Sequence, residues 1–176
     1  MTKKIAMVAT DGFEQSELFE PLKALKDAGH KVEVVSVKKD KIKGWKDGKW
    51  GKAIAVDHLA QDVKAKDYDA IVIPGGVMNP DKLRTEKSVI NFLKGFAKAN
   101  KPIAAICHAP WVLIDAGIAK DKKLTSYKTI KADLVNAGAK WSDKKVIVDG
   151  NLVTSRQPED IPAFNEAILK KIQSQK

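Results

Sequence analysis

The stretch Lys101-Pro-Ile-Ala-Ala-Ile-Cys-His-Ala-Pro-Trp111 decides the fold that we expect for this chain. Its apolar run Ile103–Ile106 is typical of a buried parallel strand, and Pro110 is suited to the first turn of a helix. Cys107, the one cysteine among 176 residues, therefore lies where a strand gives way to a helix. A side chain at such a junction projects from the carboxyl edge of the sheet, toward the positive end of the helix dipole. This position predicts an exposed thiol with a lowered pKa, held as in a nucleophile elbow.

Strand and helix patterns alternate on both sides of this stretch. Apolar or alternating runs predict strands at residues 4–10, 31–37, 68–76, 124–126, 146–148 and 152–154. Helical spacing of apolar residues predicts helices at about 11–29, 88–99, 110–116, 129–137 and from 162 onward. Near-continuous apolar strands that alternate with helices indicate a mainly parallel sheet covered by helices on both faces. We therefore expect a single three-layer α/β domain over residues 1–176.

Individual residues give this scheme its detail. Asp11 is expected to cap the first helix, with Glu14 three residues later completing a capping box. Gly29 is expected to end that helix. On the helix at 88–99, the spacing of Ile90, Leu93 and Ala97 predicts the buried face.

Residues 42–56 have a different character and predict a small antiparallel excursion from the main sheet. The pair Asp47-Gly48 suits a two-residue hairpin turn, and its register places Trp45 opposite Trp50. A structural role for the two tryptophans is the favoured interpretation. An aromatic recognition surface is the alternative.

Composition excludes several classes of protein. The formal charge is +10, but the lysines are scattered and Arg84 and Arg156 are the only arginines, which argues against specific nucleic-acid recognition. A solvated lysine-rich surface is expected, with non-specific attraction of polyanions as the alternative. No apolar run has membrane-spanning length, and neither a signal peptide nor a disulfide is expected, so the cytoplasm is the predicted location. The chain lacks dinucleotide and phosphate-loop motifs and a cysteine-rich zinc pattern, so no cofactor and no metal are expected.

Three turns at residues 10–17, 74–81 and 107–111 should meet at the carboxyl edge of the sheet. Within them, His108 is suited to orient or deprotonate the thiol of Cys107, although that cysteine has an alternative as a small buried hydrophobe. Glu14 and Glu17 share one face of a helical turn, where acids also complement the helix dipole. A buried, protonated Glu17 could donate a hydrogen bond to a thiolate, and Glu14 suits the pocket wall.

The same turns offer groups for an oxyanion. The amides of Gly75 and Gly76, with that of His108, could form an anion hole, or the glycines could simply permit a tight turn. Asp81 could orient His108, but from sequence alone it is better suited to cap the helical turn at residues 82–84.

The motifs that carry a family resemblance extend over nearly the whole chain. They are Phe13-Glu14 with Glu17, Val72-Ile-Pro-Gly-Gly76, Asn79-Pro-Asp-Lys-Leu-Arg84, Ala104-Ala-Ile-Cys-His-Ala-Pro110, Thr125-Ser-Tyr127, Asp133-Leu-Val-Asn-Ala-Gly138 and Val153-Thr-Ser-Arg156. In these motifs the chain resembles the PfpI (ThiJ/PfpI) family of intracellular cysteine proteases and protein deglycases, within the class I glutamine amidotransferase-like superfamily.

The resemblance implies a flavodoxin-like three-layer sandwich and assigns roles within the site. Cys107 is the implied nucleophile, His108 its partner, and Glu17 the carboxyl that is hydrogen-bonded to the sulfur. In the family an acid from a neighbouring subunit completes the triad, and the matching position is Asp81. A homodimer, or a larger oligomer built from dimers, is therefore implied.

The resemblance also places two residues in the substrate pocket. These are Tyr127 and Ala109, the latter in place of the glycine that usually follows the histidine.

The main hypothesis for the function is a PfpI-type cysteine hydrolase, an intracellular protease in which Cys107 attacks a carbonyl carbon. The close alternative is a deglycase or glyoxalase-like enzyme that acts on methylglyoxal or glyoxal adducts. A redox-sensing stress protein that uses oxidation of Cys107 is the alternative from another class.

Overall fold

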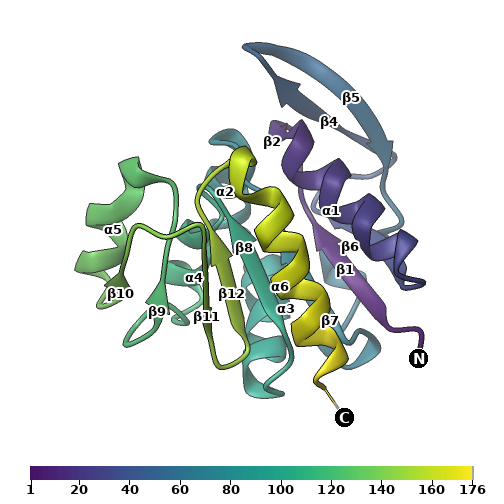
Figure 1. Ribbon diagram of the computed structural model, residues 1–176. Helices are drawn as coiled ribbons and strands as arrows, with labels where there is room; N and C mark the ends of the chain where they lie inside the picture. The colour runs from purple at the N-terminus through teal and green to yellow at the C-terminus, as the bar shows by residue number, and fades with distance from the viewer. Residues whose placement is uncertain (176) are drawn as a thin grey trace.

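In the computed structural model, which describes residues 1–175, a seven-stranded sheet forms the centre of the chain (Figure 1). In spatial order its strands are β11 (Val146–Asp149), β12 (Leu152–Ser155), β8 (Ile103–Ile106), β7 (Ala70–Ile73), β1 (Lys4–Val8), β3 (Lys31–Ser36) and β6 (His58–Leu59). Neighbouring strands are parallel except β11 and β12. The order β3-β1-β7-β8-β12 is that of flavodoxin-like sheets. The prediction of a mainly parallel, flavodoxin-like sheet is therefore confirmed.

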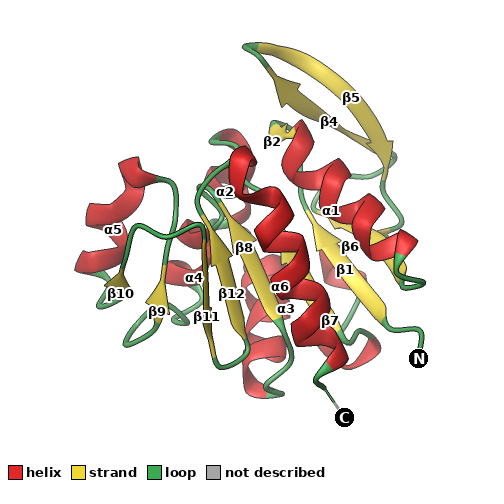
Figure 2. Ribbon diagram, viewed as in Figure 1, coloured by secondary structure: helices red, strands yellow, loops and turns green. Residues whose placement is uncertain are grey.

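Helices cover both faces of this sheet and bury one apolar cluster on each (Figures 1 and 2). The helices are α1 (Gln15–Asp27), α2 (Met78–Leu83), α3 (Lys87–Lys98), α4 (Pro110–Asp115), α5 (Lys131–Asn136) and α6 (Ile161–Gln173). Helices α1 and α6 lie against each other on one face, while α3 and α4 pack on the other. Short 3-10 turns are η1 (Ala60–Asp62), η2 (Ala65–Asp67), η3 (Lys128–Ile130) and η4 (Pro158–Asp160).

The buried face of α3 differs from the predicted one. Its fully packed residues are Val89, Phe92, Leu93 and Phe96, whereas Ile90 and Ala97 are only partly buried at the edge of the core. The face is rotated because Phe92 makes edge-to-face contacts with Tyr68 and Phe96, which draws the two phenylalanines inward.

The predicted antiparallel excursion forms a separate three-stranded sheet that projects above α1 (Figures 1 and 2). It comprises β2 (Phe13–Glu14), β4 (Lys41–Lys46) and β5 (Lys49–Ala55). Trp45 pairs with Trp50 as expected, and their rings meet edge to face with centroids 5.2 Å apart. Asp47 and Gly48 both have positive φ, which is the backbone of a type I′ turn. A further small sheet joins β9 (Lys123–Leu124) to β10 (Lys140–Trp141).

The predicted cap of the first helix is wrong, because β2 takes its place. Pairing of β2 with β4 delays the helix to Gln15, and Glu14 occupies the N-cap position without a capping hydrogen bond from its side chain. Asp11 instead accepts a hydrogen bond from the amide of Lys43 at 2.8 Å and pairs with Lys38. Gly29 follows the helix with φ of +83°, as expected of a residue that ends it.

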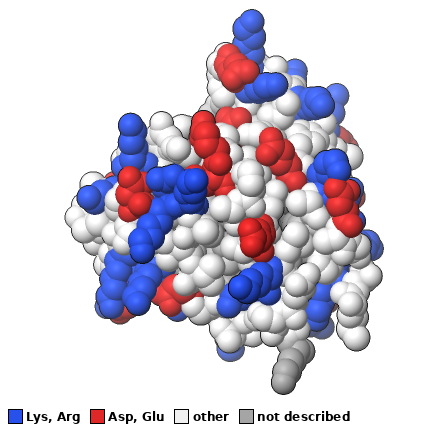
Figure 3. All heavy atoms as spheres, viewed as in Figure 1, with Lys and Arg blue, Asp and Glu red and all other residues white. Residues whose placement is uncertain are grey.

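One face of the surface shows how the charges are distributed. In Figure 3, basic side chains lie in several separate places, mostly toward the edges of this face, and acidic side chains lie among them and toward its centre. Over residues 1–175, the helices are too short or too polar to span a membrane.

Candidate active site

Two of the three turns that were expected to meet at the carboxyl edge of the sheet are held together by one buried side-chain amide. Asn79 accepts a hydrogen bond from the amide of Thr10 at 2.8 Å. The same side chain donates to the carbonyls of Pro74 and Gly75, at 2.9 and 3.2 Å. The turns after β1 and β7 are therefore fixed to each other beside the end of β8.

Cys107 occupies a strained turn directly after β8. Its φ is +64°, in the left-handed region that costs a residue with a side chain about 1–3 kcal/mol. Its amide donates to the carbonyl of Ser155 at 3.0 Å, and its carbonyl accepts from the amide of Tyr127 at 2.8 Å. The surrounding backbone thus holds the sulfur in the elbow geometry that the sequence predicted.

His108 lies against the sulfur despite being the next residue in the chain. Its Nδ1 is 3.2 Å from Sγ of Cys107, and only 8% of the histidine is exposed. Tyr127 stacks on the imidazole with ring centroids 5.0 Å apart, and Trp111 meets it edge to face at 5.2 Å. On the far side of the ring, Nε2 lies 3.3 Å from Oγ1 of Thr129. Burial lowers the pKa of His108, which favours the neutral imidazole.

Glu17 is fully buried beneath the sulfur. Its Oε1 accepts a hydrogen bond from the amide of Gly75 at 3.0 Å, and Oε2 has no hydrogen-bond partner of standard geometry. Burial raises the pKa of Glu17 to about 8, and the charge of Glu14 adds to the rise. Glu17 therefore carries its proton at neutral pH, close enough to Cys107 for each group to affect the titration of the other.

The thiol does not have the lowered pKa predicted from the helix dipole. Burial raises the pKa of Cys107, and a Glu17 carboxylate raises it further. Hydrogen bonds from the amides of Gly76 and His108 act in the opposite direction. Only 7% of Cys107 is exposed, so burial outweighs the dipole in the resting site.

Only two of the three backbone amides that were predicted to form the anion hole are available for an oxyanion. The amide of Gly75 is engaged by Glu17 and so is not free for an oxyanion. The amides of Gly76 and His108 face the sulfur. A Cβ at Gly76 would lie 2.6 Å from the carbonyl oxygen of Gly12, and φ there is +80°, so glycine is required at this close approach of two turns.

The sequence of this chain is similar to those of a known protein family. Residues 3–171 match the DJ-1/PfpI family. The chain belongs to the DJ-1/PfpI family. A Bacillus subtilis protein named "Putative cysteine protease YraA" is 44% identical over 96% of this chain and 98% of its own length. The Escherichia coli "Protein/nucleic acid deglycase 2" is 41% identical over 97% of this chain and 98% of its own length.

A solved structure from Anabaena variabilis combines a DJ-1/ThiJ/PfpI-like domain with a ferritin-like domain. It matches with a TM-score of 0.93 and 36% identity, over 98% of this chain and 48% of that longer chain. The match thus covers nearly all of this chain and about half of the longer one.

Three further residues of this DJ-1/PfpI chain were predicted to line the pocket. Glu14 and Tyr127 lie near the site, whereas Ala109 does not line it. Glu14 is half-buried and lines a cleft of about 480 Å³ with Phe19, Glu20 and Glu159, between α1, the hairpin and η4. Tyr127 covers His108. The methyl group of Ala109 packs in the apolar core beneath the site, because the elbow turns this residue inward.

Asp81 has neither of its predicted roles within one subunit. The helix that contains it, α2, begins at Met78 with Val77 as its N-cap, so Asp81 lies inside the helix and does not cap it. Its side chain is exposed, and the imidazole nitrogens of His108 face Cys107 and Thr129 instead.

Two residues of this region were not predicted from the sequence. Asn79 had a recognisable signal, since an asparagine just after a Pro-Gly-Gly turn is suited to bonding nearby backbone groups. Thr129 had none, because its contact with His108 joins segments 21 residues apart.

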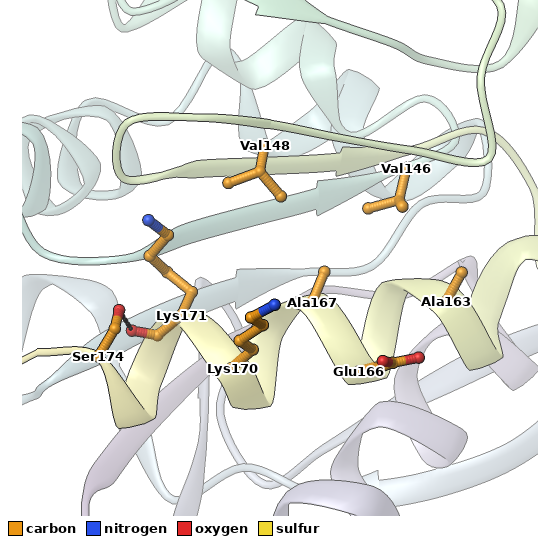
Figure 4. Close-up of a pocket in the computed structure, with 8 residues that line it drawn as sticks. All are labelled: Val146, Val148, Ala163, Glu166, Ala167, Lys170, Lys171 and Ser174. Carbon is orange, nitrogen blue, oxygen red and sulfur yellow. Dashed lines mark hydrogen bonds between the residues drawn. The ribbon is translucent and has the colours of Figure 1, made fainter.

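A second hollow of the surface lies apart from these residues. It is a groove of about 550 Å³ between β11 and α6. Figure 4 shows Val146 and Val148 of β11 on one side of it, opposite Ala163 and Ala167 of α6. Its lining includes none of the candidate site residues. Among residues 1–175, no group of three or more histidine, cysteine or acidic side chains is placed to hold a metal ion.

Proposed function

We propose that this chain is a cysteine hydrolase in which Cys107 attacks an electrophilic carbonyl carbon. The observation that carries the proposal is the 3.2 Å contact between Sγ of Cys107 and Nδ1 of His108, at an elbow with φ of +64°. A nucleophile and a base within hydrogen-bond reach, with the base held by further contacts, are the signature of covalent catalysis.

The arrangement supports a two-step reaction. His108 accepts the thiol proton at Nδ1 as Sγ forms a bond to the carbonyl carbon, and the imidazolium then protonates the leaving group. Water hydrolyses the resulting thioester with the same imidazole as base, which restores the thiol. The amides of Gly76 and His108, which face the sulfur, are suited to stabilise the oxyanion as negative charge moves onto the carbonyl oxygen.

Glu17 supports this reaction by remaining neutral. Because its pKa is about 8, it does not oppose a thiolate with a second negative charge at neutral pH. As a protonated acid it is also suited to donate a hydrogen bond to the sulfur.

Two substrate classes offer Cys107 an electrophilic carbonyl carbon. The thioester route with its leaving group applies to the first, the peptidase-type hydrolase, which we propose first. It is supported by the similarity to the protein named for cysteine protease activity. A deglycase that acts on carbonyl adducts is the second candidate, supported by the similarity to a named deglycase. The 7% exposure of Cys107 favours this second class, because a small carbonyl group needs less access than an extended peptide.

A side-by-side assay of a peptide, a methylglyoxal-modified thiol or amine, and free methylglyoxal tests the proposal. We expect one of the three to be turned over and Cys107→Ser to abolish that turnover. Activity that survived the substitution would refute thiolate catalysis at this site. No turnover of any substrate, together with peroxide oxidation of Cys107 before the 41% exposed Met78, would instead support the redox-sensing alternative.

The proposed setting is the cytoplasm, where a lone free cysteine stays reduced. A homodimer or an oligomer of dimers remains part of the proposal, with the exposed Asp81 available to a neighbouring subunit.

A further inference from the structure

The imidazole of His108 already has a hydrogen-bond partner on each nitrogen within a single subunit. Nδ1 faces Sγ of Cys107 at 3.2 Å, and Nε2 faces Oγ1 of Thr129 at 3.3 Å. A neutral imidazole carries its proton on one nitrogen only, so the partner on one side determines what the other side can do.

We propose that Thr129 is a positioning residue, whose hydroxyl accepts the Nε2 proton of His108 and so leaves Nδ1 free to take the thiol proton. This role rests on the proposed function of the Cys107–His108 pair. When the imidazole becomes charged, the Nε2–H bond to Thr129 is retained, so proton transfer requires no rotation of the ring.

The segment that carries Thr129 is anchored where this role requires it. Thr129 lies in η3, directly after Tyr127. The amide of Tyr127 donates to the carbonyl of Cys107 at 2.8 Å, and its ring stacks on His108 with an interplanar angle of 25°. The segment is therefore tied both to the backbone of the nucleophile and to the ring that the threonine contacts.

Trp111 provides a second anchor for the imidazole. Trp111 meets the His108 ring at an interplanar angle of 68° and donates from Nε1 to Asp133 at 2.8 Å. Asp133 lies in α5, which continues from η3. Arg84 lies over the Trp111 ring at 5.3 Å. The tryptophan thus links the helix after the elbow to the helix after Thr129 and limits movement of the hydroxyl.

Thr129→Val is the decisive variant, because it removes the hydroxyl and keeps the branched shape at an exposed position. We expect the rate of Cys107 alkylation by iodoacetamide near neutral pH to fall about three- to tenfold, the factor that one neutral hydrogen bond is worth. The dependence of this alkylation rate on pH should also differ from that of the wild type. In ¹⁵N NMR spectra, the His108 ring should shift from the Nε2-protonated form toward a mixture of tautomers. Thr129→Ser should restore all three properties.

Two comparisons separate this role from others. Thr85→Val removes another exposed threonine hydroxyl, which bonds a backbone carbonyl away from the site, and should leave the alkylation profile unchanged. Asp81→Asn tests a carboxylate supplied by a second subunit. If Thr129→Val left the profile and the tautomer as in the wild type, the proposal would be overturned. A change of both in Asp81→Asn would then assign the role to that carboxylate.

The readouts do not depend on knowing the substrate. If no peptide or adduct were hydrolysed but Thr129→Val shifted the tautomer and the alkylation profile, the proposed function would fail and the positioning role would stand.

Discussion

Replacing Glu17 with glutamine removes a carboxyl group that the folded chain keeps protonated up to a pH of about 8. In the unfolded chain the same group loses its proton near its ordinary pKa of 4.5. Between these values the folded state holds the extra proton, so the free energy of unfolding falls as the pH rises. The slope is about 1.4 kcal/mol per pH unit.

The effect is measured as a difference between wild type and Glu17→Gln. Over two pH units, from about 5.5 to 7.5, the wild type should lose roughly 3 kcal/mol relative to the variant. The glutamine side chain is neutral throughout, and its carbonyl oxygen can still accept the hydrogen bond from Gly75. Urea denaturation at each pH gives the required free energies.

Two controls make the measurement specific to the buried carboxyl. Glu20→Gln removes an exposed acid from the same helix and should give a difference that varies little over this pH range. Repeating the Glu17 comparison in a Cys107→Ser background removes the coupled thiol. The slope should persist there, because burial is the largest cause of the raised pKa. A flat difference between wild type and Glu17→Gln would refute the assignment of a neutral Glu17.

Further substitutions test the packing of the site and of the sheet. In Gly75→Ala the new Cβ would lie 2.5 Å from Oε1 of Glu17 and 2.7 Å from a strand carbonyl, so we expect a loss of about 1–3 kcal/mol in urea denaturation together with slower alkylation of the thiol. Gly117→Ala, where nothing lies within 4 Å, should cost only the roughly 1 kcal/mol of its left-handed backbone and should not slow alkylation. Burial raises the pKa of Glu33, but hydrogen bonds from Lys31 and two other side chains outweigh this and lower it to about 2. The advantage of the wild type over Glu33→Gln should therefore be complete above pH 4.5 and disappear as the pH falls toward 2; an advantage that persists at pH 2 would contradict this account.

The sequence predicted the features that depend on local pattern. The apolar run before Cys107 defines the strand, and Pro110 marks the start of the helix. Together they place Cys107 at the elbow. The pair Asp47-Gly48 likewise determines which tryptophans face each other, because a type I′ turn fixes the register of a two-residue hairpin.

The features that were missed depend on contacts between distant segments. Asp11 is a plausible helix cap until β2 pairs with β4, about 30 residues later. From the sequence alone, no partner can be assigned to the amide of Gly75. Folding buries Glu17 beside this amide, and the carboxyl group then accepts its hydrogen bond. The pKa of Cys107 could not be predicted for the same reason, since the helix dipole is a local property and the degree of burial is not.

The placement of the site within the sheet has a consequence for how the molecule moves. Strands β1, β7 and β8, which precede the three turns, are each paired on both sides. Their amides should exchange with deuterium only when the whole domain opens, whereas the separate β4–β5 hairpin should exchange through local openings. The reacting groups thus rest on the slowest-exchanging part of the molecule. Accommodation of substrates of different size must come from the separate hairpin beside Glu14, because the η3 segment beside His108 is tied to the backbone of Cys107.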